Sequence, residues 1–146
     1  MQQENINIFY TDDDEDDRDF FKVAVNEISH SLQIITLGDG DKLIDLLNNP
    51  PPTPHIIFLD LNMPRKNGYE VLKELKLIKS NKGIPVIILS TSNDEISIGT
   101  TRQLGAKMYI TKPSSINLLK KAIKHILSIN WETFDSYSED FVYKSD

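Results

Sequence analysis

Two short stretches, "HIIFLDL" at residues 55–61 and "IPVIILSTS" at residues 84–92, decide the fold. Each is continuous, apolar and rich in β-branched residues, which is typical of strands buried on both faces of a sheet. Three weaker strand-like runs cover residues 6–11, 32–40 and 107–113. We therefore expect five strands.

Between these runs, apolar residues recur every three or four positions, the spacing of amphipathic helices. The expected helices run through Phe20–Ile28, Leu43–Leu47, Tyr69–Ile78, residues 93–104 and Ile116–Leu127. Strands and helices thus alternate five times along the chain. This order predicts an α/β fold with three αβα layers, in which a five-stranded parallel sheet is joined by right-handed crossovers.

The fourth expected helix has an unfavourable composition. Gly99, Thr100 and Thr101 lie in its middle, and each is less favourable there than alanine, by some tenths to about 1 kcal/mol. Two interpretations remain open at this stage. Either tertiary packing holds the helix, or the helix is marginal because it must move.

The bulk composition narrows the class of protein. The chain has 146 residues, 39% of them apolar and 26% charged, and a net charge of -6. These values fit one globular domain, and the acidic balance argues against nucleic acid as a partner. No apolar run approaches the roughly 20 residues of a membrane helix, no signal-peptide pattern is present, and cysteine is absent. We expect a cytoplasmic protein that does not enter a membrane.

Polar side chains follow the carboxyl ends of the predicted strands. Asp12 and Asp13 follow the first strand, Asp60 the third, Ser90 the fourth and Lys112 the fifth. In an open parallel sheet these ends form the edge at which functional groups gather. An ionised carboxylate within an apolar segment needs a partner, and Mg²⁺ with its preference for oxygen ligands is a natural one.

The acidic run "DDDEDD" at residues 12–17 is by itself ambiguous, because such a run is also typical of a solvated loop or of a helix start. A calcium-binding EF-hand loop is excluded: Asp17 stands where that loop requires glycine, and Val23 stands where it requires glutamate. Any metal site must therefore be completed by residues from other parts of the fold.

Taken together, these positions resemble the receiver domain of two-component response regulators of the chemotaxis-regulator type. The resemblance covers roughly residues 5–129. It depends on "DD" at 12–13, "FLDLNMPRKNG" around Asp60, "VIILSTS" around Ser90, and "KMYITKP", which contains Tyr109 and Lys112.

The resemblance implies a phosphoacceptor and a metal site. Asp60 would take a phosphoryl group from a phosphohistidine. Asp13, Asp60 and the backbone carbonyl of Asn62 would bind Mg²⁺, with Mn²⁺ able to substitute, and Asp12 would act through a metal-bound water. No organic cofactor is implied.

The resemblance also implies a switch. Lys112 and the hydroxyl of Ser90 would contact phosphoryl oxygens, and Tyr109 would turn inward on phosphorylation. That rotation would change the surface formed by the fourth helix, fifth strand and fifth helix. The Lys112–Pro113 peptide is expected to be cis, as is usual in this family.

The rest of the acidic run has a separate interpretation. Asp14, Glu15, Asp16 and Asp17 are expected to cap the first helix and to occupy its first turn, where negative charge complements the helix dipole. One departure from the family is Thr91, where a smaller residue is common. The lifetime of the phosphoryl group is therefore not transferable from relatives.

The domain organisation is expected to be a receiver domain over residues 1–130 and an acidic, aromatic tail over residues 131–146, without a separate output domain. The tail reads "WETFDSYSEDFVYKSD". It is either disordered or a short amphipathic helix or strap. A strap would pack on a partner or on the basic side of the fifth helix, which carries Lys120, Lys121 and Lys124.

The function that the resemblance implies is that of a stand-alone response regulator, phosphorylated by a sensor histidine kinase or a phosphotransfer protein and acting through protein contacts. We expect a monomer or weak homodimer, and no turnover of a separate substrate. A receiver-fold adaptor that is not phosphorylated is the alternative. An aspartyl phosphatase is disfavoured because Asn62 stands where those enzymes carry a second aspartate.

Overall fold

A single parallel sheet forms the centre of the computed structural model, which describes residues 5–145. Its strands are β1 (Ile6–Thr11), β2 (Leu32–Leu37), β3 (Ile56–Leu59), β4 (Val86–Ser90) and β5 (Met108–Thr111). They lie in the order β2-β1-β3-β4-β5, and every neighbouring pair is parallel. The strand prediction is confirmed: β1 has the expected bounds, and the other four strands are shorter than expected by one to three residues at the ends that differ.

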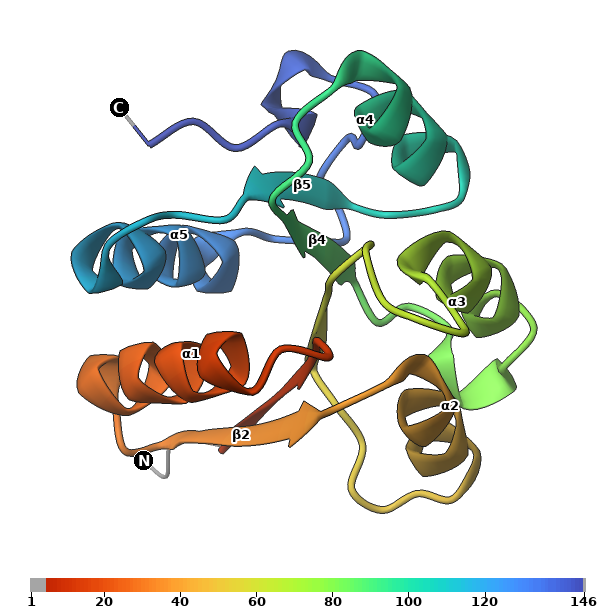
Figure 1. The fold of residues 1–146 in the computed structure, drawn as a ribbon, viewed down its shortest axis with the longest axis horizontal. Coiled ribbons are helices and arrows are strands. Elements are labelled where there is room, and N and C mark those ends of the chain that lie inside the picture. The colour runs from red at the N-terminus through yellow and green to blue at the C-terminus, as the bar shows by residue number, and fades with distance from the viewer. Residues whose placement is uncertain (1–4, 146) are drawn as a thin grey trace.

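Helices cover both faces of the sheet (Figure 1). They are α1 (Glu15–Ile28), α2 (Gly40–Asn48), α3 (Gly68–Leu75), α4 (Glu95–Gln103) and α5 (Ile116–Ser128). Helices α1 and α5 lie on one face, and α2, α3 and α4 lie on the other. The three-layer αβα prediction is therefore confirmed. Helix α3 is shorter than expected, because the chain leaves it after Leu75 and forms the short 3₁₀ helix η1 (Lys79–Asn81).

Both faces of the sheet are apolar, as the unbroken runs predicted. Along β3, Ile56 and Phe58 belong to the core under α1 and α5, whereas Ile57 and Leu59 belong to the core under α2, α3 and α4. All four are buried. Side chains that alternate between two cores explain why this strand lacks polar positions.

Side-chain caps begin all five α-helices. Each cap accepts a hydrogen bond from a backbone N–H in the first turn, and the caps are Asp14, Asp39, Asn67, Asp94 and Ser115. Such caps satisfy N–H groups that lack partners within the helix. The predicted cap of α1 is confirmed. Because each cap lies between a strand and the α-helix that follows it, the caps also help to fix the loops at the carboxyl edge of the sheet.

The chain after α5 turns back across the molecule as a strap, which we define as residues 131–145. The strap contains a short 3₁₀ helix, η2 (Glu139–Phe141), and Val142 forms a parallel bridge with Tyr109 of β5. The strap corresponds to one of the two alternatives that the sequence left open, and not to a disordered tail. Its contacts with α5 differ from the expectation: within residues 5–145, Lys121 donates to the Ser145 carbonyl, and no strap carboxylate pairs with an α5 lysine.

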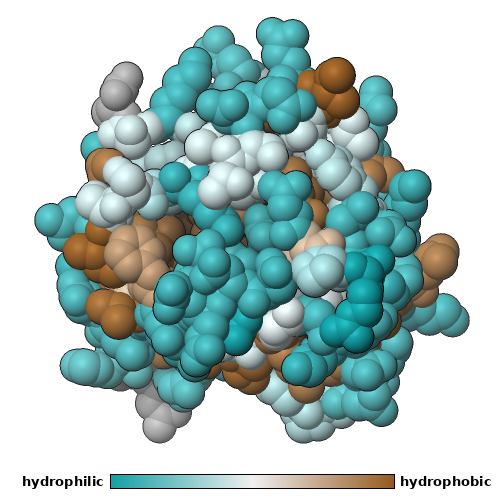
Figure 2. Space-filling model, in the orientation of Figure 1, coloured by the Kyte–Doolittle hydropathy of each residue, from teal (hydrophilic) through white to brown (hydrophobic). Residues whose placement is uncertain are grey.

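The outer surface is mostly hydrophilic on the face shown in Figure 2, where hydrophobic side chains form small separate areas. Within residues 5–145, none of the helices combines the length and the apolar character needed to cross a membrane.

Candidate functional site

The carboxyl ends of β1, β3 and β5 bring Asp12, Asp60 and Lys112 to one edge of the sheet. The backbone N–H of Asp60 donates to the Thr11 carbonyl at 3.0 Å, and that of Lys112 donates to the Ser90 carbonyl at 2.8 Å. These bonds continue the sheet ladder one residue past each strand. Segments separated by about 100 residues are thereby held side by side, as the sequence predicted.

The three carboxylates of Asp12, Asp13 and Asp60 each offer an oxygen within 4.8 Å of the others. They line an open hollow of about 560 Å³ together with the first turn of α1, Asn62, Thr91 and Lys112. Oxygen donors at this separation fit a small divalent ion such as Mg²⁺ or Mn²⁺.

Asp60 is the most constrained of the three acids. The residue is only 3% exposed, and its Oδ1 atom accepts no hydrogen bond from the described part of the chain. The Lys112 ammonium lies 3.7 Å from this oxygen. Burial, followed by the negative charge of Asp12, raises the pKa of Asp60 to about 7, although the charge of Lys112 opposes the rise. A second cation at this oxygen would restore the ionised form.

Asp12, by contrast, has partners on both oxygens. Its Oδ1 accepts the Asp14 backbone N–H at 3.0 Å, and its Oδ2 accepts the Tyr10 hydroxyl and the Lys112 ammonium. Asp13 is exposed and makes no side-chain hydrogen bond within residues 5–145. Asp13 and Asp60 therefore have oxygens free for direct coordination, and Asp12 is suited to an indirect role.

Lys112 lies at the centre of the negative charge. Its Nζ atom is 2.8 Å from Asp12 and 2.7 Å from Asp17. Burial alone would lower the pKa of Lys112, but hydrogen bonds to Asp12 and Asp17 outweigh burial and raise the pKa above its usual value. The ammonium therefore stays charged beside Asp60 at physiological pH.

The part played by Asp17 is a functional contact that the sequence interpretation missed. Asp17 was assigned only to the first turn of α1, where it indeed lies. Its position one turn beyond the cap Asp14 also directs it back toward the rim, and there it binds Lys112. Its place in the first turn of α1, beside the carboxyl edge of the sheet, was the available signal.

The expected cis peptide between Lys112 and Pro113 is wrong. The cis bonds of the described residues are Pro50–Pro51 and Pro51–Pro52. Trans is the favoured form of an X–Pro bond by about 0.5–1 kcal/mol, and the Lys112 ammonium reaches Asp12 from the trans arrangement.

Ser90 and Tyr109 are linked through the loop that follows β4. The Ser90 Oγ atom accepts the backbone N–H of Ser92 at 3.2 Å. The Tyr109 hydroxyl donates to the Ser92 carbonyl at 2.6 Å, and burial raises the pKa of this tyrosine to about 12. The ring of Tyr109 is fully buried. The inward position that we expected after phosphorylation is thus already present in this structure.

Gly68, the first residue of α3, packs against the backbone of the Asp60 loop. A Cβ atom on Gly68 would lie 2.5 Å from the Asp60 carbonyl oxygen and 2.8 Å from the Leu61 Cα atom. The Gly68 N–H donates to the Leu61 carbonyl at 2.9 Å. The absence of a side chain therefore allows α3 to fix the loop that carries Asp60.

Comparison with known sequences agrees with this arrangement. The family model of the response regulator receiver domain matches residues 8–124. The chain is 37% identical over 122 residues to response regulator RR06 of Streptococcus pneumoniae, covering 84% of this chain and 53% of that protein. It is 35% identical over 116 residues to response regulator Rcp1 of Synechocystis, covering 76% and 78%. The chain thus spans about half the length of the first relative.

Solved structures show the same fold. The phosphorylated cyanobacterial phytochrome response regulator RcpA has a TM-score of 0.74 and 31% identity, with 90% of this chain and 96% of that chain covered. The Mn²⁺-bound form of Rcp1 has a TM-score of 0.72 and 30% identity, with 89% and 97% covered. The fold, the acidic rim and the family match agree: the chain belongs to the response regulator receiver domain family.

Proposed function

We propose that this chain is a phosphoacceptor switch in which Asp60 receives a phosphoryl group from a phosphohistidine of a sensor histidine kinase or a phosphotransfer protein. The observation that carries the proposal is the environment of Asp60. One oxygen of its buried carboxylate accepts no hydrogen bond within residues 5–145, and that oxygen lies 3.7 Å from the Lys112 ammonium. Receiver domains as a family are phosphorylated on an aspartate in an acidic, metal-binding pocket.

Asp13, Asp60 and the backbone carbonyl of Asn62 would hold Mg²⁺, or Mn²⁺ in its place, and Asp12 would contact it through a water. When bound, the ion offsets the negative charge of the rim and of the transferring phosphoryl group. The free oxygens of Asp13 and Asp60 and the fully occupied oxygens of Asp12 support this division of roles.

The reaction forms one bond and breaks one. An Asp60 carboxylate oxygen attacks phosphorus, the N–P bond of the donor breaks, and its electron pair returns to the imidazole nitrogen. Lys112 already lies beside the Asp60 oxygen and would form an ion pair with the added phosphoryl group. Ser90, at the end of β4, would donate a hydrogen bond from its hydroxyl to a second phosphoryl oxygen.

The direct test is intact-mass measurement after incubation with acetyl phosphate, with and without Mg²⁺. We expect the wild type to gain the mass of one phosphoryl group only when Mg²⁺ is present, with acetate as the leaving group. Asp60→Asn should abolish the adduct, because an amide oxygen is not a nucleophile of this kind.

The matched control is Asp19→Asn, which alters an exposed carboxylate of α1 outside the rim. This variant should be phosphorylated like the wild type. An adduct that persists in Asp60→Asn, or that never forms in the wild type with Mg²⁺, would contradict the proposal and favour an adaptor that is not phosphorylated.

The output of such a switch is a protein contact. We place that contact on the face formed by α4, β5 and α5, and we expect a monomer or weak homodimer. Turnover of a separate substrate is not part of the proposal, because Asn62 offers no carboxylate for acid–base catalysis on a leaving group.

A further inference from the structure

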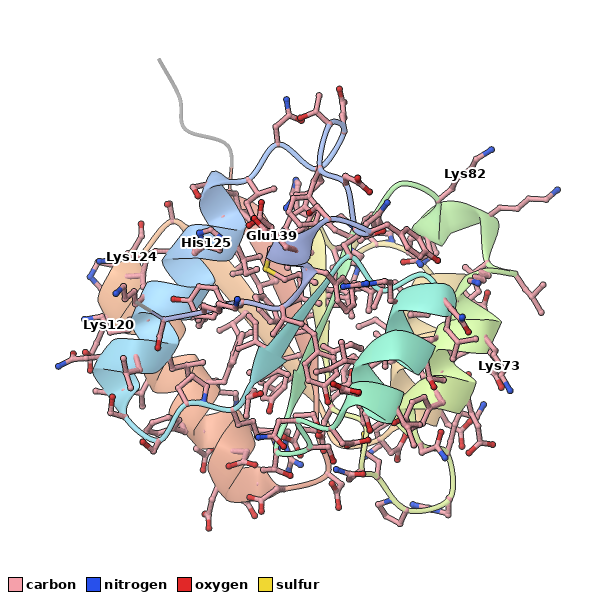
Figure 3. The ribbon with its side chains drawn as sticks, turned by 90° about the horizontal axis from the view of Figure 1, so that it is seen from above. Lys73, Lys82, Lys120, Lys124, His125 and Glu139 are labelled. Atoms are coloured by element: carbon pink, nitrogen blue, oxygen red, sulfur yellow. The ribbon has the colours of Figure 1, made fainter. Side chains whose placement is uncertain are left out.

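The strap covers the edge of β5. The Tyr143 backbone N–H donates to the Tyr109 carbonyl at 2.9 Å, and Val142 pairs with Tyr109 as a short parallel bridge. Phe141 is fully buried and belongs to the same apolar core as Tyr109. Seen from above, the segment with Glu139 lies over β5, between α4 and the α5 helix that carries His125 (Figure 3).

The strap also contacts the two helices that flank β5. On the α4 side, the Arg102 guanidinium stacks over the Phe141 ring at 4.5 Å, a favourable cation–π contact. On the α5 side, the rings of His125 and Tyr143 are 5.2 Å apart, and Trp131 packs on the core under α1 and α5. A partner that approaches the α4–β5–α5 face therefore meets the strap first.

The outward side of the strap has its own chemistry. Tyr137 is 65% exposed. Four carboxylates are exposed along the same segment: Glu132, Asp135, Glu139 and Asp140. The outward side of the strap thus presents an aromatic ring and negative charges, and the Arg102 guanidinium lies 5.8 Å from the centre of the Tyr137 ring.

Tyr109 connects the strap to the phosphoacceptor rim. Its hydroxyl is bonded to the Ser92 carbonyl, and its own carbonyl is bonded to the strap. Ser92 in turn donates its N–H to Ser90, and its hydroxyl accepts the Asn62 side-chain amide at 3.2 Å. Tyr109 is therefore held through its hydroxyl by the loop that follows β4 and through its backbone carbonyl by the strap.

We propose that docking of the strap is coupled to phosphorylation of Asp60 through Tyr109. The inference rests on the proposed function of Asp60. The docked strap and the inward Tyr109 occur together in this structure and share a core, so each stabilises the other. A phosphoryl group that favours inward Tyr109 must then favour the docked strap, and a docked strap must strengthen binding at Asp60 by the same factor.

The test uses the full chain with Mg²⁺ and beryllofluoride, a non-covalent analogue of the phosphoryl group. Amide hydrogen exchange is followed over residues 137–145. In the wild type, saturating beryllofluoride should slow exchange in this segment by about 5-fold or more, the lower end of typical couplings between sites.

Two variants test reciprocity. Phe141→Ala removes the buried anchor, and Tyr143→Pro removes the N–H that donates to Tyr109 while leaving Phe141 in place. Both should expose the strap to fast exchange and weaken beryllofluoride binding by about 5-fold or more, although neither residue touches the rim. Lys144→Ala, an exposed strap residue, is the matched control and should behave like the wild type.

The outcomes separate the two proposals. A wild type that forms no acetyl-phosphate adduct would overturn both. A normal adduct with strap exchange that is unchanged or faster in beryllofluoride would overturn only the strap proposal. The strap proposal alone would also be overturned if Tyr143→Pro speeds amide exchange in the strap but binds beryllofluoride as tightly as the wild type.

Discussion

The Asp60 loop and helix α4 flank the same rim but are packed in opposite ways. At the start of α3, a Cβ on Gly68 would collide with the Asp60 carbonyl at 2.5 Å, whereas a Cβ on Gly99 in α4 would meet nothing within 4 Å. Ile96, also in α4, is 80% exposed. The loop that receives a charge is thus closely packed against α3, whereas the outer side of α4 faces open space.

The contacts of α4 explain how so weak a helix persists. The Thr101 hydroxyl donates to the Ser97 carbonyl at 2.9 Å, the Ser97 hydroxyl donates to the cap Asp94, and the Tyr69 hydroxyl bonds to Ser97 from α3. Both Ser97 and Thr101 are buried. Directional polar bonds on one side, rather than close apolar packing all round, hold this helix in place.

The first test of the difference between the Asp60 loop and α4 is to remove the negative charge of Asp60. Between pH 4 and pH 7, native Asp60 keeps a proton that an unfolded chain has released, because its pKa is raised from 3.8 to about 7. The free energy of unfolding must then fall as pH rises through this window and level off above it. In metal-free buffer at pH 8, Asp60→Asn should therefore be more stable than the wild type by up to about 4 kcal/mol.

Urea unfolding at pH 4 and pH 8, with and without Mg²⁺, measures this difference. The extra stability of Asp60→Asn over the wild type should nearly vanish at pH 4, where Asp60 is protonated. At pH 8 it should shrink when Mg²⁺ stabilises the ionised wild type. An equal gain at both pH values would mean that charge is not the cause and that Asp60 is less buried in solution than in this structure.

The second way is to fill the space at Gly68. Gly68→Ala should lower the free energy of unfolding by about 2 kcal/mol, because overpacking against backbone atoms forces the chain to shift. The shift falls on Asp60 and Leu61, so formation of the acetyl-phosphate adduct should slow as well. Urea midpoints and adduct rates check both effects, and a neutral result would show that the loop is no more constrained than α4.

Most of the fold followed from the sequence, because two unbroken apolar strands and the fivefold repetition of a strand followed by a helix leave few other topologies. The rim residues followed as well, since parallel strands bring their carboxyl ends to one edge. The Asp17–Lys112 pair was missed because a first-turn acid already had an adequate local explanation. The path of the strap could not be predicted either: its aromatic spacing was compatible with packing, but nothing in the sequence indicated the backbone pairing of Val142 and Tyr143 with Tyr109 of β5.

The third and smallest test addresses α4 itself. Gly99→Ala should raise the free energy of unfolding by about 0.5–1 kcal/mol, because alanine loses less backbone freedom on folding and its Cβ meets no neighbour. Urea unfolding beside Gly68→Ala gives the comparison directly, since the same substitution should have opposite signs at the two positions. The adduct on Asp60 should form as in the wild type, because α4 contributes no residue to the hollow. A loss of stability in Gly99→Ala would mean that position 99 is as closely packed as position 68, and the contrast between α4 and the Asp60 loop would not exist.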